Sequence, residues 1–168
     1  MTIDWKVGST VVNIITGKIN GGKTTRLIAA YEKSGVGEGF ALIKKMEGTI
    51  VHSYNARQLS SGEERLLILR DCWLTDDFDE RCRIGPYYFS DSVLNWIEDE
   101  IRKAVDMGIT PIFLDEIGKL EVMGKGYDAV LRVLLKSEID IYVTIRENLV
   151  EMVLHHYQIS TYNIMTSD

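Results

Sequence analysis

The chain contains little cysteine, little proline and no long apolar segment. Cys72 and Cys82 have neither the spacing of metal ligands nor a C-x-x-C pattern, so two reduced thiols are expected rather than a disulfide. No run of about 18 apolar residues and no signal-peptide pattern at the N-terminus is present. We therefore expect no membrane association and a cytoplasmic location.

An excess of basic residues is also absent. The net charge is −6, and no basic face is evident of the kind that grips nucleic-acid phosphates, so stable nucleic-acid binding is not expected. The 168 residues are 45% hydrophobic and 26% charged, which is ordinary for a globular protein. Length and composition predict one domain, spanning residues 1–168.

One short segment carries the most information. Gly17–Thr24 reads GKINGGKT and fits the phosphate-binding pattern G-x-x-x-x-G-K-[ST]. Such a loop wraps nucleotide phosphates with backbone N–H groups, and its glycines provide clearance and unusual dihedral angles. Lys23 would reach the β- and γ-phosphates and serve catalysis, and the Thr24 hydroxyl would ligate Mg²⁺. The predicted nucleotide-binding residues are Gly17, Lys18, Ile19, Asn20, Gly21, Gly22, Lys23, Thr24 and Thr25.

The neighbouring sequence favours a phosphate-binding loop over an ordinary glycine-rich turn. Residues 11–16 (VVNIIT) form a β-branched apolar run that is typical of a buried strand. Residues 23–33 show helical periodicity. Strand, loop and helix thus occur in the order that the motif needs, and the N-terminal end of the helix favours an anion.

The middle of the chain predicts short antiparallel strands. Residues 40–45 and 49–54 flank a tight-turn signal. Residues 65–70 fit a third strand, although their apolar run fits the start of a helix equally well. Residues 84–89 fit another strand, in which Pro86 indicates an edge position.

The rest of the chain alternates between strands and helices. Helices are predicted at residues 90–107, 126–136 and 147–156, and strands at 109–115 and 139–145, with a possible short strand in the C-terminal tail. Alternation at both ends of the chain predicts an α/β fold with a mostly parallel sheet and helices on both faces. The segment at about 40–89 is expected to be a small antiparallel insertion on the sheet edge.

A second motif follows the predicted strand at 109–115. Asp115 and Glu116 end the apolar run IFLDE. A P-loop protein needs an acidic group at the end of a buried strand to hold Mg²⁺, and Asp115 is predicted to do so through a water. Glu116 is predicted to orient and deprotonate an attacking water. The alternative, two surface carboxylates at the start of a loop, is disfavoured by the phosphate-binding loop upstream.

Two polar residues end the predicted strand at 139–145. Thr144 is a candidate sensor of the γ-phosphate. Arg146 is a candidate catalytic residue that would neutralise transition-state charge, in the manner of an arginine finger supplied by the same chain. A salt bridge at the start of the following helix is the alternative for Arg146, and the sequence does not decide between the two.

With these motifs placed, the chain resembles the small P-loop nucleoside-triphosphatase family of the thermophile type, to which the human cancer-related nucleoside-triphosphatase belongs. The acidic motif is the most specific part, because most P-loop proteins do not follow the acidic pair with Ile-Gly-x-Leu-Glu. The segments that carry the resemblance are GKINGGKT (17–24), GF (39–40), LSSGEE (59–64), IGPYYFSD (84–91), LDEIGKLEVMGKG (114–126) and VTIRENL (143–149).

The resemblance implies a single three-layer P-loop domain related to RecA-type ATPases. It implies slow, Mg²⁺-dependent hydrolysis of ATP, GTP, CTP and UTP to diphosphate and phosphate, with loose base selectivity. Carried over by motif, Lys23 and Thr24 contact phosphate and Mg²⁺, Glu116 is the base, and Glu121 is an acidic neighbour without an assigned role.

Two other functions fit the same motifs. A small-molecule kinase would transfer the phosphoryl group to an alcohol and would need an acceptor pocket with a lid. A nucleotide-dependent switch or assembly factor would use slow hydrolysis to reset its state. The arginines that could belong to a lid are Arg57, Arg65, Arg70, Arg81 and Arg83. Aromatic residues that could stack on any base are Trp73, Tyr87 and Tyr88.

Overall fold

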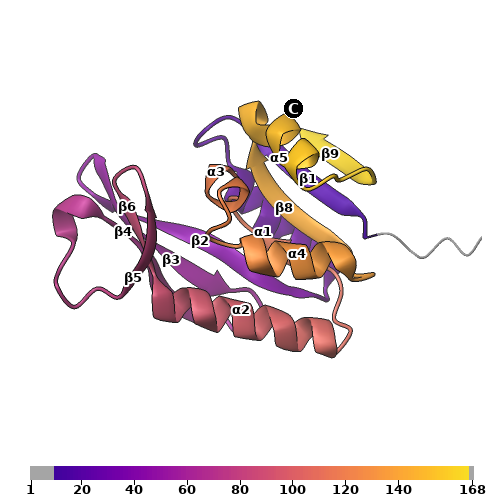
Figure 1. Cartoon of the computed structure of the whole chain (residues 1–168), viewed down its shortest axis with the longest axis horizontal. Coiled ribbons are helices and arrows are strands. Elements are labelled where there is room, and N and C mark those ends of the chain that lie inside the picture. The colour runs from indigo at the N-terminus through magenta and orange to yellow at the C-terminus, as the bar shows by residue number, and fades with distance from the viewer. Residues whose placement is uncertain (1–9, 167–168) are drawn as a thin grey trace, which may run out of the picture.

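A nine-stranded sheet runs through the part of the chain that the computed structural model describes, residues 10–166 (Figure 1). The strand order is β5-β6-β4-β3-β2-β7-β8-β1-β9. Five strands form a parallel half, because each pairs in parallel with its neighbour. These strands are β2 (Glu38–Glu47), β7 (Ile112–Leu114), β8 (Ile141–Arg146), β1 (Val12–Gly17) and β9 (Tyr162–Thr166).

The other four strands form an antiparallel half that continues the same sheet. Strand β2 is shared: residues 38–40 pair with β7, and residues 40–47 pair with β3 in a hairpin. In order across the sheet, the remaining strands are β3 (Ile50–Gln58), β4 (Glu64–Arg70), β6 (Tyr87–Ser90) and β5 (Glu80–Ile84). The α/β class is confirmed, but the sheet is mixed rather than mostly parallel, and the antiparallel part is larger than a small insertion.

Helices cover both faces of the sheet. Successive side chains of a strand point to opposite faces, so a strand that is apolar throughout needs a covering layer on each face. On β1, Ile14 packs into a core that includes helices α2, α4 and α5, whereas Ile15 packs with Leu27 of α1 on the opposite face. The helices are α1 (Lys23–Ser34), α2 (Asp91–Asp106), α3 (Lys119–Val122), α4 (Asp128–Lys136) and α5 (Val150–His156). Two 3₁₀ turns occupy Asp71–Trp73 and Glu147–Leu149. None of the helices within residues 10–166 is long and apolar enough to cross a membrane.

Local sequence signals explain where several elements begin and end. The Ser90 hydroxyl accepts a hydrogen bond from the backbone N–H of Val93 at 3.3 Å and so caps α2, as Ser does at many helix starts. The predicted strand at 84–89 is interrupted: residue 84 ends β5 and residues 87–89 lie in β6, whereas Gly85 (φ 55°) and Pro86 form the turn between them. The ambiguous segment at 65–70 is strand β4, and the short helix α3 was not expected.

Candidate active site

The predicted phosphate-binding loop joins β1 to α1. Gly22 adopts φ 78° at the N-cap of α1, and Asn20 adopts φ 58°. A Cβ on Gly21 would lie 2.8 Å from the backbone oxygen of Lys18, which leaves no room for a side chain. This geometry agrees with the predicted roles of Gly21 and Gly22 in shaping the loop. The left-handed conformation of Asn20 was not predicted from the sequence.

Lys23 lies against its own loop. Its side chain is buried, and Nζ donates a hydrogen bond to the backbone oxygen of Lys18 at 2.7 Å. On the other side of the loop, Lys44 of β2 donates from Nζ to Oδ1 of Asn20 at 2.6 Å. Sequence reasoning missed Lys44, because only the β2–β3 hairpin brings this residue to the loop. Two lysine ammonium groups therefore contact the loop.

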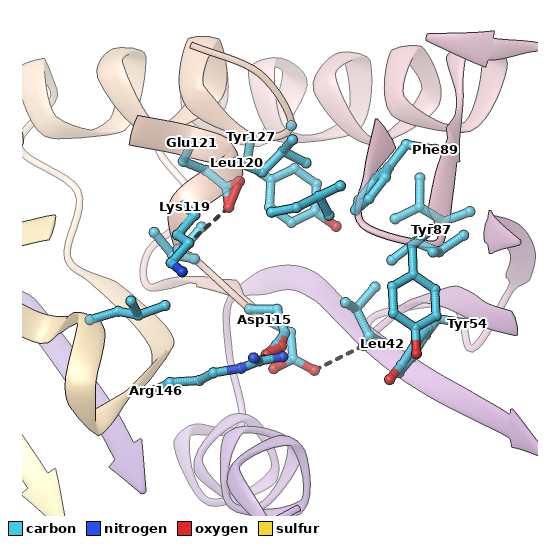
Figure 2. A pocket seen from close by; sticks show the side chains of 18 of the residues that line it. Leu42, Tyr54, Tyr87, Phe89, Asp115, Lys119, Leu120, Glu121, Tyr127 and Arg146 are labelled. Atoms are coloured by element: carbon cyan, nitrogen blue, oxygen red, sulfur yellow. Dashed lines mark hydrogen bonds and ion pairs between the residues drawn. The ribbon is translucent and has the colours of Figure 1, made fainter. Parts of the chain in front are cut away.

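The carboxylate of Asp115 connects the phosphate-binding loop to the sheet. Thr24 Oγ1 donates to Asp115 Oδ2 at 2.7 Å, and the backbone N–H of Leu42 donates to the same oxygen at 2.9 Å. Thr144 Oγ1 donates to Oδ1 at 2.6 Å, so Thr144 faces Asp115. Figure 2 shows Asp115 beside the guanidinium of Arg146, with the bond to Leu42 dashed. Three elements, α1, β2 and β8, thus hold one carboxylate in place.

Burial governs the protonation of this carboxylate. Asp115 is almost completely buried, and burial raises its pKa, while the hydrogen bonds from Thr144, Leu42 and Thr24 oppose the rise. The Thr24 hydroxyl and the Asp115 carboxylate offer the hard oxygen ligands that Mg²⁺ prefers. No cluster of three or more His, Cys, Asp or Glu side chains that could hold a metal occurs within residues 10–166. Two protein oxygens suit Mg²⁺, which takes its other ligands from water and phosphate.

Glu116, the residue after Asp115, has an unusual backbone conformation. Its φ is 62°, a region that residues other than glycine rarely adopt and that is found at functional sites. Its backbone N–H donates to Thr144 Oγ1 at 2.7 Å, which anchors this turn to β8. Arg146 donates from Nε to Glu116 Oε1 at 3.3 Å, with both side chains partly exposed. The structure thus brings together Asp115, Glu116 and Arg146, three of the predicted site residues.

A cavity of about 360 Å³ opens beside the acidic pair (Figure 2). Residues of both halves of the sheet line it, and most of them are apolar. Tyr87 lies in its wall, but Trp73 and Tyr88 do not: Trp73 packs on His52, with ring centroids 4.7 Å apart. The lining comprises Ile19, Leu42, Tyr54, Leu67, Ile68, Ile84, Tyr87, Phe89, Asp115, Glu116, Ile117, Gly118, Lys119, Leu120, Glu121, Gly126, Tyr127, Arg146, Asn148 and Leu149.

Glu121 and Tyr127 bring polar groups to this apolar wall. Glu121 is 3% exposed, and its Oε1 accepts a hydrogen bond from the N–H of Gly118 at 3.1 Å. Burial raises the pKa of Glu121 to about 8, and the charges of Glu116 and Asp128 add to the rise, whereas backbone hydrogen bonds lower it. Sequence reasoning gave Glu121 no role, because no local pattern indicates that a cavity faces this residue.

The remaining predicted loop residues lie around these groups. Gly17 ends β1, and Lys18 and Ile19 are exposed in the loop. Thr25 is exposed in the first turn of α1. Arg26, the next residue, donates to the backbone oxygens of Thr16 at 2.9 Å and Met165 at 2.6 Å, so it ties the start of α1 to β1 and β9.

Comparison with known proteins identifies the class. The chain has the fold of two solved structures. One is the solution structure of a human cancer-related nucleoside triphosphatase, 22% identical, with a TM-score of 0.64, covering 95% of this chain and 89% of that one. The other is the crystal structure of THEP1 from the hyperthermophile Aquifex aeolicus, 19% identical, with a TM-score of 0.64, covering 92% and 88%. At these identities the similarity establishes the fold.

The family follows from the sequence. A family model described as NTPase matches residues 13–168, and the chain belongs to this family. It is a nucleoside-triphosphatase, as the resemblance in its motifs indicated. No curated protein matches the chain significantly in sequence.

Proposed function

We propose that this nucleoside-triphosphatase is a cytoplasmic, Mg²⁺-dependent enzyme that hydrolyses ATP, GTP, CTP and UTP with loose base selectivity. Water attacks the γ-phosphate, and the products are the nucleoside diphosphate and phosphate. The observation that carries the proposal is the hydrogen bond of 2.7 Å between Thr24 and Asp115. It joins the residue that ends the phosphate-binding motif to the carboxylate directly after β7.

The phosphates are held by the loop. Its backbone N–H groups and the N-terminal end of α1 face the anion, and Lys23 leaves its contact with the Lys18 carbonyl to bind the β- and γ-phosphates. Thr24 and Asp115 would hold Mg²⁺, which when bound neutralises charge on the phosphate oxygens. Lys44 lies close enough to the loop, through Asn20, to add a second positive charge.

Glu116 and Arg146 have different proposed roles in hydrolysis. Glu116 is the proposed base that orients a water and accepts its proton, since it is partly exposed and follows directly on the metal-binding position. Arg146 is the proposed stabiliser of transition-state charge. Arg146 is paired with Glu116, so in this proposal its guanidinium serves both the carboxylate and the phosphates.

Loose base selectivity follows from where the contacts lie. Every role proposed above touches phosphate or Mg²⁺, and discrimination between bases needs polar groups that would be left unpaired by the wrong base. Stable nucleic-acid binding is not part of the proposal, since the net charge is −6.

The test measures phosphate release from the four common triphosphates, with Mg²⁺ and with excess EDTA. We expect kcat/KM values within about tenfold of one another and no release in EDTA. A preference for one nucleotide above about a hundredfold would contradict loose selectivity, and undiminished release in EDTA would contradict the Mg²⁺ dependence.

A further inference from the structure

One residue of β8 is bonded to three consecutive residues that follow β7. Thr144 Oγ1 donates to Asp115 Oδ1 at 2.6 Å and accepts from the backbone N–H of Glu116 at 2.7 Å. The backbone oxygen of Thr144 accepts from the N–H of Ile117 at 2.9 Å. Strand β8 pairs with β7, so Thr144 lies beside the point where β7 ends. Thr144 therefore fixes the path of the chain as it leaves β7.

The hydroxyl of Thr144 is already in use on both sides. A threonine hydroxyl has one proton to donate, and here Asp115 accepts it. Thr144 is 0% exposed, and the residues that line the cavity do not include it. Sensing of the γ-phosphate, the role that the sequence suggested for Thr144, would require the hydroxyl to give up Asp115. The geometry therefore favours a role in shaping the site over a contact with substrate.

The residue that most needs such support is Glu116. Its φ of 62° is a conformation that residues other than glycine keep only where surrounding contacts hold it. Because the hydroxyl proton of Thr144 goes to Asp115, a lone pair of Oγ1 is free for the N–H of Glu116. Without this hydroxyl, Asp115 would keep the N–H of Leu42 as a donor at 2.9 Å, whereas Glu116 would lose the bond that anchors its backbone. Removing the hydroxyl should thus disturb Glu116 more than Asp115.

We propose that Thr144 is a positioning residue for Glu116: its hydroxyl holds the backbone of Glu116 so that the carboxylate is directed at the attacking water. Thr144 touches neither the nucleotide nor this water, and it acts only through Glu116. The inference rests on the proposed role of Glu116 as the base. A displacement of about 1 Å in a catalytic group can lower a rate about 10²-fold, so one hydrogen bond behind the base can have a large effect.

The experiment compares Thr144→Val with Thr144→Ser. Single-turnover hydrolysis of ATP with Mg²⁺ gives the rate, and titrations with ADP and with the β,γ-imido analogue of ATP give the affinities. Thr144→Val keeps the shape of the side chain and removes the hydroxyl, so the rate should fall about 10²-fold while both affinities stay as in wild type. Thr144→Ser retains the hydroxyl and should recover most of the rate.

Thr16→Val is the matched control. Thr16 lies in β1, the other neighbour of β8, and is 6% exposed, but its Oγ1 has no hydrogen-bond partner within residues 10–166. The same substitution there removes a buried hydroxyl that positions nothing. Thr16→Val should therefore hydrolyse ATP like wild type, and a loss equal to that of Thr144→Val would overturn the proposal.

Glu116→Gln separates this inference from the proposed function. Adding Thr144→Val to Glu116→Gln should lower the rate little further, because the carboxylate that Thr144 positions is no longer there. If Glu116→Gln alone is as fast as wild type, the proposed base is wrong and the positioning role with it. If Glu116→Gln is slow but Thr144→Val is as fast as wild type, the positioning role alone is wrong.

Two other results would also overturn the positioning role. Weaker binding of the ATP analogue with unchanged binding of ADP would make Thr144 a sensor of the γ-phosphate. Losses that multiply in the double variant would show that Thr144 acts independently of Glu116. Melting temperatures identify the folded variants. If Thr144→Val does not fold, Thr144→Ala and Thr144→Ser differ by a single oxygen, and equal rates in these two would refute the role of the hydroxyl.

Discussion

The two halves of the sheet each contain an arginine–glutamate pair, and the pairs look alike. Arg146 contacts Glu116 at 3.3 Å in the parallel half, and Arg57 contacts Glu64 at 3.1 Å in the antiparallel half. The side-chain exposures are also similar, 44% and 35% against 38% and 27%. An exposed pair of this kind contributes only about 0–1 kcal/mol to stability in either place.

What differs is the backbone beneath each pair. Glu116 follows a short strand that is buried on both faces, in a left-handed conformation next to the buried carboxylate of Asp115. Glu64 and Arg57 lie opposite each other on the β3–β4 hairpin. The contact between an arginine and a glutamate therefore does not by itself indicate a catalytic role, whereas the backbone position beneath it does. Matched substitutions in the two halves separate the effect of that position from the effect of the ion pair.

The largest effect is expected from Lys23→Ala. Removing the ammonium should abolish measurable phosphate release, because a charge-assisted contact is worth about 1.5–3 kcal/mol in binding and more in the transition state. Lys103→Ala, which removes an exposed lysine from α2, is the matched control and should turn over like wild type. Folded Lys23→Ala protein with normal hydrolysis would refute the role of the loop.

Arg146→Ala and Arg57→Ala compare the two pairs directly. If Arg146 stabilises transition-state charge, its removal should lower kcat by about 10³-fold, the lower end for an arginine finger, whereas Arg57→Ala should leave kcat unchanged. Single-turnover hydrolysis measures both. A loss in Arg146→Ala of less than about tenfold would assign Arg146 to a structural salt bridge.

Glu116→Gln and Glu64→Gln compare the glutamates of the two pairs. Glu116→Gln should lower hydrolysis by about 10²- to 10⁴-fold, the usual worth of a positioned base, and should retain nucleotide binding because Asp115 remains. Glu64→Gln should change neither. Binding of a fluorescent nucleotide is measured alongside the rate; binding and rate that fall in proportion would make Glu116 a metal-binding or structural residue.

The smallest effect on turnover is expected for Glu121→Gln, whose effect appears in stability instead. The pKa of Glu121 is about 8 in the folded protein and 4.5 for the ordinary group. Between these values the folded state keeps a proton that the unfolded chain has released, so the free energy of unfolding falls as the pH rises through this window and levels off above it.

Chemical denaturation at pH 5 and pH 8.5 measures this decline. Wild type should lose about 2–5 kcal/mol more than Glu121→Gln across the window, because the variant has no proton to release there. Parallel pH dependences of wild type and variant would show that Glu121 does not titrate in this range.

Local patterns predicted the parallel half well. The strand at 11–16 and the helix at 23–33 agree with β1 and α1, since an apolar β-branched run, a glycine-rich loop and an amphipathic helix follow one another without interruption. The helix at 90–107 likewise agrees with α2, which Ser90 caps. The motif order also assigned Thr24 and Asp115 to one predicted Mg²⁺ site, and a hydrogen bond of 2.7 Å joins their side chains.

The antiparallel half was predicted less well for a physical reason. Pro86 was read as part of an edge strand, whereas the left-handed Gly85 before it turns the chain back, and only the pairing of β5 with β6 reveals this. The extent of the sheet depends on β2, whose ten residues pair first with β7 and then with β3. The cavity was not predictable, because its wall gathers side chains from Ile19 to Leu149 that have no common sequence pattern.

A single oxygen atom joins the two halves. Oδ2 of Asp115 accepts from Thr24 in the loop and from the backbone of Leu42, and Leu42 also lines the cavity. If Thr24 turns its hydroxyl to Mg²⁺, as the proposed function requires, Oδ2 keeps the N–H of Leu42 as its donor. The strand that both halves of the sheet share therefore stays bonded to the acidic site whichever partner Thr24 has.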